Sequence, residues 1–222
     1  SDLAQPLAPA AIVPPPIQAL SASLNGPVVT RSPQKFPKRI DLVAIGVSTG
    51  GPNALAEVFP SFPRNLPVPI VITQHMPPVF TKILAERLTD CSELTVREGA
   101  PGEVLKPGGV WIAPGGFHMT VERQGTNLVL QTNTEPPENS CRPAVDVMFR
   151  SIARLMGSST LGVILTGMGQ DGLRGCEDLV SRGAQVIVQD EQSSVVWGMP
   201  GFVARAGLDR KSTRLNSSHV AL

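Results

Sequence analysis

Four short, continuous apolar runs constrain the fold of this chain more than any other feature of its sequence. They are IDLVAIG (residues 40–46), VPIVITQH (68–75), LGVILTG (161–167) and AQVIVQD (184–190). A strand that is covered on both faces of a sheet is apolar along its length, whereas a strand with one wet face alternates apolar and polar residues. The runs therefore predict parallel strands inside a sheet that is covered on both sides.

Helical patterns separate these runs. Apolar residues recur three and four positions apart in FTKILAERLTD (80–90) and PAVDVMFRSIARLM (143–156), and helices are also predicted over PNALAEVFPSF (52–62) and GLRGCEDLVSRG (172–183). Strands that alternate with helices predict a doubly wound, mostly parallel, Rossmann-like α/β sheet with helices on both faces. Between residues 94 and 132 the runs are shorter, and Gly125-Thr126-Asn127 predicts the turn of an antiparallel β-hairpin near one edge.

The chain divides into three segments. Residues 1–38 are rich in Pro, Ala and Ser without apolar periodicity, which predicts a linker or tether. Residues 39–208 carry the α/β pattern and form the predicted folded domain. Residues 209–222 are polar and aperiodic, and we expect them to be a non-native tail. Because the first residue is not methionine, we expect the chain to be a fragment of a longer protein.

Composition narrows the classes of function. The 222 residues include 19 Lys and Arg against 18 Asp and Glu, a formal charge of +1, which gives no reason to expect nucleic acid as a partner. Three cysteines and three histidines without ligand-like spacing favour neither a disulfide framework nor a structural metal site, and they suit a reduced, cytoplasmic compartment. No apolar run approaches the roughly 20 residues of a membrane-spanning helix, so no membrane insertion is expected.

Polar residues that could form a proton relay fall where three of the predicted strands end. Ser48 follows the first run, His75 closes the second, and Asp171 follows the third. Ligands of an open parallel sheet bind outside the carboxyl ends of its strands. A serine nucleophile needs a base within reach, and the base needs an orienting acceptor on its other nitrogen. The positions therefore predict that these three residues face one crevice.

Alternatives remain open for each member of the relay. Gly46-x-Ser48-x-Gly50 meets the spacing of a nucleophile elbow, but glycine-rich turns after a first strand also bind phosphate. The chain lacks the second glycine of a dinucleotide motif and the lysine of a P-loop, so a phosphate site is poorly supported. Asp146, inside a predicted helix, is the weaker alternative to Asp171, whereas Asp190 ends a strand and stays open.

The positions of the histidines along the chain distinguish between types of serine hydrolase, which differ in the order of their catalytic residues. The α/β-hydrolase order is Ser, Asp, His, yet the only histidine after Asp171 is His219, in the suspected tail. His118 lies inside the predicted hairpin, where a packing role is expected. An ordinary α/β-hydrolase is therefore not expected, and the order Ser-His-Asp has to be considered.

Six blocks of the sequence resemble, in order, the signature motifs of the bacterial chemotaxis methylesterase family (CheB): IGVSTGGP, VITQHMPP, WIAPGGFHM, RPAVDVMF, GVILTGMGQDG and VVWGMP. The resemblance covers residues 39–208 and implies a cytoplasmic methylesterase catalytic domain that hydrolyses γ-glutamyl methyl esters on chemoreceptors and can deamidate receptor glutamines. It implies Ser48 as nucleophile, His75 as base and Asp171 as its partner, an oxyanion hole at Thr49 and Met168, and neither cofactor nor metal.

The resemblance also implies partners and shows departures. The family usually carries a receiver domain that masks the active site until a phosphodonor kinase acts, and without it we expect this chain to be free of that inhibition. Val47 and Gln170 stand where smaller or shorter residues are common, which would alter substrate fit. Two rival functions are a phosphate-binding module that uses the glycine turns and a catalytically idle domain that docks on receptor helices.

Overall fold

The structure is a computed structural model that describes residues 39–209 of the chain. The predicted linker, residues 1–38, lies outside this range, as does the predicted tail except for Asp209, which is buried. Within residues 39–209, no helix is both long enough and apolar enough to cross a membrane.

Six parallel strands form the central sheet, in the order β3-β4-β2-β1-β7-β8. Their bounds are β1 (Leu42–Val47), β2 (Ile70–Gln74), β3 (Thr95–Glu98), β4 (Gly109–Ile112), β7 (Thr160–Ile164) and β8 (Gln185–Val188). Each of the four apolar runs supplies one of these strands, and β1 and β2 are buried along their entire length. The parallel sheet predicted from these runs is confirmed.

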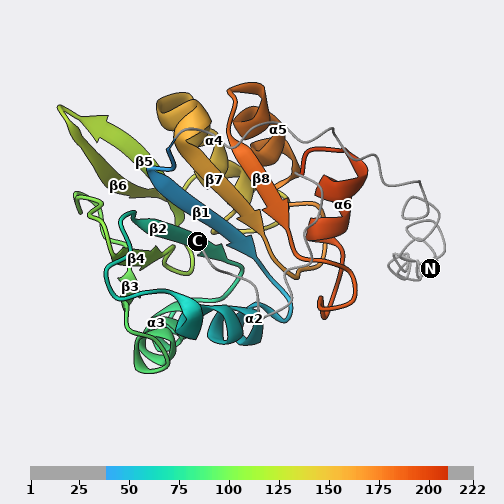
Figure 1. Ribbon diagram of the computed structural model, residues 1–222, viewed down its shortest axis with the longest axis horizontal. Coiled ribbons are helices and arrows are strands. Elements are labelled where there is room, and N and C mark those ends of the chain that lie inside the picture. Colours follow the sequence, from blue (N-terminus) through green and yellow to red (C-terminus); the bar gives the residue numbers. More distant parts are fainter. Residues whose placement is uncertain (1–38, 210–222) are drawn as a thin grey trace, which may run out of the picture.

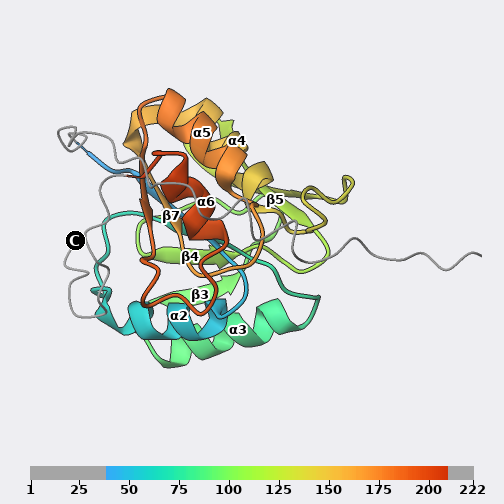
Figure 2. The ribbon, with the colours of Figure 1, turned by 90° about the vertical axis from the view of Figure 1, so that its right-hand side faces the viewer.

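Helices cover both faces of this sheet, so the domain has three layers (Figures 1 and 2). One face carries α2 (Gly51–Val58), the short 3₁₀ turn η2 (Phe59–Ser61) and α3 (Phe80–Asp90), and the other carries α4 (Val145–Met156), the turn η3 (Gly157–Ser159), α5 (Leu173–Ser181) and α6 (Met199–Arg205). The predicted fold class is confirmed. Helix α6 was not among the predicted helices, because Pro200 and Gly201 lower its helical propensity. Pro200 lies in the first turn, where its missing N–H is not needed.

The predicted hairpin is also present. Strands β5 (His118–Gln124) and β6 (Asn127–Asn133) pair antiparallel as a separate two-stranded sheet, and Gly125 in the turn has φ 60°. The inner side chains of the hairpin, Met119 and Leu130, share a core with Phe149 of α4. The hairpin thus rests on α4 beside the main sheet (Figure 1).

Two hydrophobic cores lie on opposite sides of β1. Val43 and Ile45 belong to the core under α2 and α3, whereas Leu42 and Ala44 belong to the core under α4 and α5. This burial on both faces explains why the run 40–46 contains no polar alternation.

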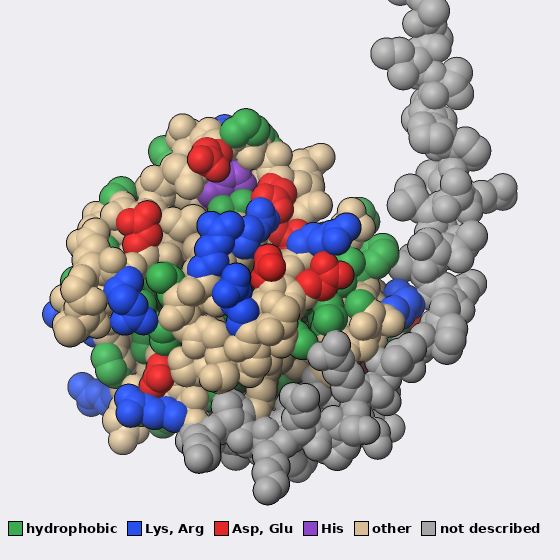
Figure 3. All heavy atoms as spheres, turned by 90° about the horizontal axis from the view of Figure 1, so that it is seen from above, with side chains coloured by type: hydrophobic (Ala, Val, Ile, Leu, Met, Phe, Trp, Pro, Cys, Tyr) green, Lys and Arg blue, Asp and Glu red, His purple; other side chains and the backbone are tan. Residues whose placement is uncertain are grey.

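Charged side chains are mixed on the outer face of the α4–α5 layer. Figure 3 shows basic and acidic groups interleaved there. Arg150 of α4 pairs with Glu138 and lies 4.0 Å from Asp178 of α5, while Arg174 lies 3.3 Å from Glu177. This arrangement agrees with the balanced charge of the sequence.

The strand order places a topological switch point beside β1. After β1 the chain enters α2 on one face of the sheet, and after β7, the neighbour of β1, it enters α5 on the other face. Ligand sites of open α/β sheets form at such a point, outside the carboxyl ends of the strands. Ser48, His75 and Asp171 all follow strands that end there.

Candidate active site

The backbone of Ser48 is held by both neighbouring strands. Its N–H donates to the carbonyl of Thr166 beyond β7 (3.0 Å), and its carbonyl accepts from the Gln74 side chain at the end of β2 (3.0 Å). Gly50, with φ 84°, then turns the chain into α2, and a Cβ at this position would lie 2.7 Å from Val195. Within residues 39–209, the Ser48 hydroxyl itself makes no hydrogen bond. The turn therefore fixes the serine but leaves its hydroxyl free.

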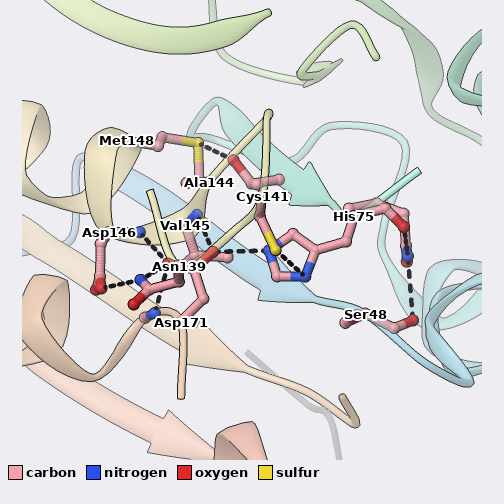
Figure 4. A network of polar contacts seen from close by, with 12 residues as sticks. Ser48, His75, Asn139, Cys141, Ala144, Val145, Asp146, Met148 and Asp171 are labelled. Carbon is pink, nitrogen blue, oxygen red and sulfur yellow. Dashed lines mark hydrogen bonds and ion pairs between the residues drawn. The ribbon is translucent and has the colours of Figure 1, made fainter. Parts of the chain in front are cut away.

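His75 follows β2, and its two ring nitrogens face different partners. Nε2 lies 2.6 Å from Oδ2 of Asp171, and Nδ1 lies 3.6 Å from the thiol of Cys141. Ser48 lies on the side of the ring away from Asp171 (Figure 4). Gln74 ties the two loops together, because its amide donates to the carbonyls of both Ser48 and His75, each at 3.0 Å.

Asp171 lies between the first turns of α4 and α5, with 2% of its surface exposed. Besides the imidazole, it accepts hydrogen bonds from the N–H groups of Val145 (2.6 Å), Asp146 (3.0 Å) and Gly172 (3.0 Å), and from the amide of Asn139 (3.0 Å). Burial raises the pKa of Asp171, but the hydrogen bonds from His75 and the backbone outweigh it and hold the pKa below its ordinary value. The carboxylate is therefore ionised.

Asp146, the weaker alternative to Asp171 as the partner of the histidine, makes no hydrogen bond to His75. Its carboxylate accepts from the N–H of Gly175 in α5 (2.6 Å) and from the same Asn139 amide (2.8 Å) (Figure 4). Asp171 thus caps the helix that carries Asp146, and Asp146 caps the helix that follows Asp171. Burial and the charge of Asp171 raise the pKa of Asp146 to about 6.

The imidazole of His75 is strongly basic in this setting. Burial lowers its pKa, but the hydrogen bonds with Asp171 and Cys141 and the charge of Asp171 outweigh burial and raise the pKa to about 9. Because Asp171 accepts the proton on Nε2, the neutral ring has its lone pair on Nδ1. The basic lone pair therefore lies on the side of the ring away from Asp171.

The loops that contain Thr49 and Met168 adjoin at Ser48. A Cβ on Gly167 would lie 2.8 Å from Cβ of Ser48, so the β1 and β7 loops are in contact. Inside the described range, the backbone N–H groups of Thr49 and Met168 donate no hydrogen bond. Met168 is 67% exposed. Two free donors thus lie in the loops that flank the serine.

The other polar candidates have structural contacts. His118 is buried, with Nε2 3.1 Å from the carbonyl of Pro136 and Nδ1 accepting from the N–H of Ala144, so the expected packing role fits. Asp190 accepts from the N–H of Ser193 within its own turn. His219 lies outside the described residues.

Sequence reasoning missed three residues of this site. Gln74 left a signal, since it is a polar residue in an apolar run and is only 2% exposed. Asn139 and Cys141 left none, because they lie in the irregular segment ENSCRP, whose course depends on tertiary contacts.

Comparison with known proteins agrees with this architecture. The family model "CheB methylesterase" matches residues 43–219. Protein-glutamate methylesterase/protein-glutamine glutaminases from Trichodesmium erythraeum and Maricaulis maris are 55% and 48% identical, over 83% and 87% of this chain. The chain spans about half of these relatives, 53% and 48% of their lengths. The crystal structure of the Thermotoga maritima CheB methylesterase catalytic domain superposes with a TM-score of 0.75 at 45% identity, covering 77% of this chain and 90% of that one.

Proposed function

The chain belongs to the CheB methylesterase family, and we propose that its residues 39–208 form a serine esterase that removes methyl groups from γ-glutamyl methyl esters of chemoreceptors. One observation carries the proposal. The imidazole of His75 is bound at Nε2 by the buried carboxylate of Asp171, and Ser48 lies on the other side of the ring. A base that is oriented on one nitrogen and free on the other is what a serine nucleophile requires.

The reaction follows from these positions. Ser48 Oγ attacks the ester carbonyl while Nδ1 of His75 takes its proton, and the carboxylate of Asp171 stabilises the imidazolium that forms. The backbone N–H groups of Thr49 and Met168 stabilise the oxyanion, and each such donor contributes about 3–4 kcal/mol in comparable sites. The imidazolium protonates the methoxide oxygen as its bond to the carbonyl carbon breaks, so that methanol leaves. Water, activated by the same imidazole, then releases glutamate from the acyl-enzyme, and a glutamine side chain would react similarly with loss of ammonia.

The resting site needs one rearrangement before this reaction. Nδ1 of His75 lies 3.6 Å from the thiol of Cys141 and has no hydrogen bond with the Ser48 hydroxyl. Catalytic hydrogen bonds are often long or absent before substrate binds. Rotation of the Ser48 side chain toward Nδ1 would complete the relay.

The partners in this proposal are the cytoplasmic helices of methylated chemoreceptors. A receiver domain, phosphorylated by a phosphodonor kinase, would regulate the full-length form. The chain covers about half of its relatives, which leaves room for such a domain. The enzyme would act in the cytoplasm, where the receptor glutamates are exposed.

The proposal is tested by methanol release from methylated chemoreceptor membranes, with the wild-type chain and the Ser48→Ala variant. Loss of a nucleophile that acts as a unit with its base costs about 10⁶-fold in turnover, so release by the variant should fall to background. Thermal unfolding of both proteins controls for folding. Release that persists in the variant contradicts the assignment of Ser48. Phosphate binding that survives loss of both Ser48 and His75 would instead favour an anion-binding module.

A further inference from the structure

The contact between His75 and Cys141 brings together two side chains that bind soft metal ions. The ligand atoms of His75, Cys141 and Asp171 all lie within 4.8 Å of one another. Cys141 is half-buried, and the His75 side chain is 13% exposed, so both are partly accessible from solvent. The proposed reaction has no use for the thiol.

We propose that His75 Nδ1 and Cys141 Sγ form an inhibitory binding site for Zn²⁺. Zinc binds imidazole nitrogen at about 2.0–2.1 Å and thiolate sulfur at about 2.3 Å, so two such ligands in a tetrahedral site lie about 3.5–3.6 Å apart. The observed separation of the two atoms is 3.6 Å. An ion fits between them with little movement of either side chain.

Asp171 completes the site without binding the ion. Its carboxylate accepts a hydrogen bond from Nε2 of His75, so that the neutral ring carries its lone pair on Nδ1. This carboxylate–histidine arrangement orients the metal-bound imidazole in many zinc sites and raises its basicity. The tautomer that makes His75 a base therefore also makes it a metal ligand.

Zinc binding releases protons to solvent. The Cys141 thiol loses its proton, and a protonated imidazole also loses the proton on Nδ1, so that zinc binds a thiolate sulfur and a free ring nitrogen. With only two protein ligands, the remaining positions belong to water or to the Ser48 hydroxyl, so binding is weaker than in a closed four-ligand site. Soft thiolate and imidazole select zinc over hard cations such as Mg²⁺.

Inhibition follows if the proposed esterase mechanism holds, because zinc occupies the lone pair that must receive the Ser48 proton. Binding itself does not depend on that mechanism. Sequence spacing could not have revealed the site, since 66 positions separate the two ligands.

The test is calorimetric titration of the metal-free chain with Zn²⁺, in a His219→Ala background that removes the histidine outside the described residues. We expect one ion per chain, with affinity at least tenfold lower in Cys141→Ala and Cys141→Ser. Asp171→Asn should weaken binding by about 10–100-fold, as loss of such a partner does elsewhere. Cys91→Ala is the matched control and should bind as the background protein does, and Mg²⁺ should not bind.

Zinc affinity that is unchanged in both Cys141 variants overturns the proposal, as does a background protein that binds no zinc. Cys141→Ser keeps the size of the side chain, so it guards against misfolding of the alanine variant. Methanol release with and without Zn²⁺ then separates the two hypotheses. If the chain binds zinc but releases no methanol, the metal site stands and the esterase proposal fails. If the chain releases methanol and zinc neither binds nor inhibits it, the esterase proposal stands and the metal site fails.

Discussion

Asp171 and Ser48 lie at opposite ends of the same predicted relay, and the fold holds them very differently. The Asp171 carboxylate is 2% exposed and accepts five hydrogen bonds, three of them from backbone N–H groups. Among residues 39–209, Ser48 is anchored only through its backbone, and its hydroxyl makes no hydrogen bond. In the proposed mechanism, the charge that stabilises the imidazolium is therefore fixed before substrate arrives, and the nucleophile keeps the freedom to rotate.

Among the variants that test this contrast between Asp171 and Ser48, the largest loss of activity is expected from Asp171→Asn. The amide cannot accept at both of its atoms, so it breaks backbone hydrogen bonds at α4 and favours the wrong tautomer of His75. Loss of this function costs about 10⁴-fold in kcat in a comparable relay. Steady-state methanol release measures the change, and Asp190→Asn, a turn aspartate, is the matched control. Equal activity of the two variants would show that Asp171 only supports the fold.

A change of pH should alter kcat/KM by a smaller factor, because it changes the protonation of His75. Because the pKa of His75 is raised to about 9, the ring is mostly protonated at neutral pH and cannot act as a base. We expect kcat/KM to rise about tenfold per pH unit between pH 7 and 8 and to level off near pH 9.

The free energy of unfolding should change in the opposite direction and fall as the pH rises. The contribution of His75 to the free energy of unfolding is complete below its unfolded pKa of about 6.5 and is lost as pH rises through 9. A rate that is flat from pH 7 to 9 would mean that the proton is lost at a lower pH.

The smallest effect is expected from Asn139→Ala, which loosens the fixed end without removing a charge. The Asn139 amide donates to both Asp171 and Asp146, so its loss leaves two buried carboxylates with less compensation. We expect destabilisation of about 1–3 kcal/mol, measured by denaturant unfolding. Loss of about tenfold in kcat should accompany a shifted pH profile, a change that a purely structural role would not cause. Asn133→Ala, which removes an asparagine at the end of β6, is the control.

The sequence predicted those parts of the molecule that depend on local pattern. The four apolar runs form strands, and the polar residues predicted at their ends, Ser48, His75 and Asp171, lie at one edge of the sheet because parallel strands end on one side. The catalytic roles of these residues stay predictions. Helix α6 escaped detection because tertiary burial of Met199 and Val203 stabilises a segment with low helical propensity. The contacts of Asn139 and Cys141 could not be predicted, since the loop that carries them takes its course from α4 and α5.

The reciprocal capping of α4 and α5 links the chemistry to the state of the whole domain. Neither carboxylate has its partners until both helices have docked, so a chain in which this pair has come apart no longer holds the Asp171 carboxylate against its imidazole. Activity would then vanish before the rest of the structure melts. Under the proposed function, partly unfolded molecules would therefore be inactive rather than active on the wrong ester.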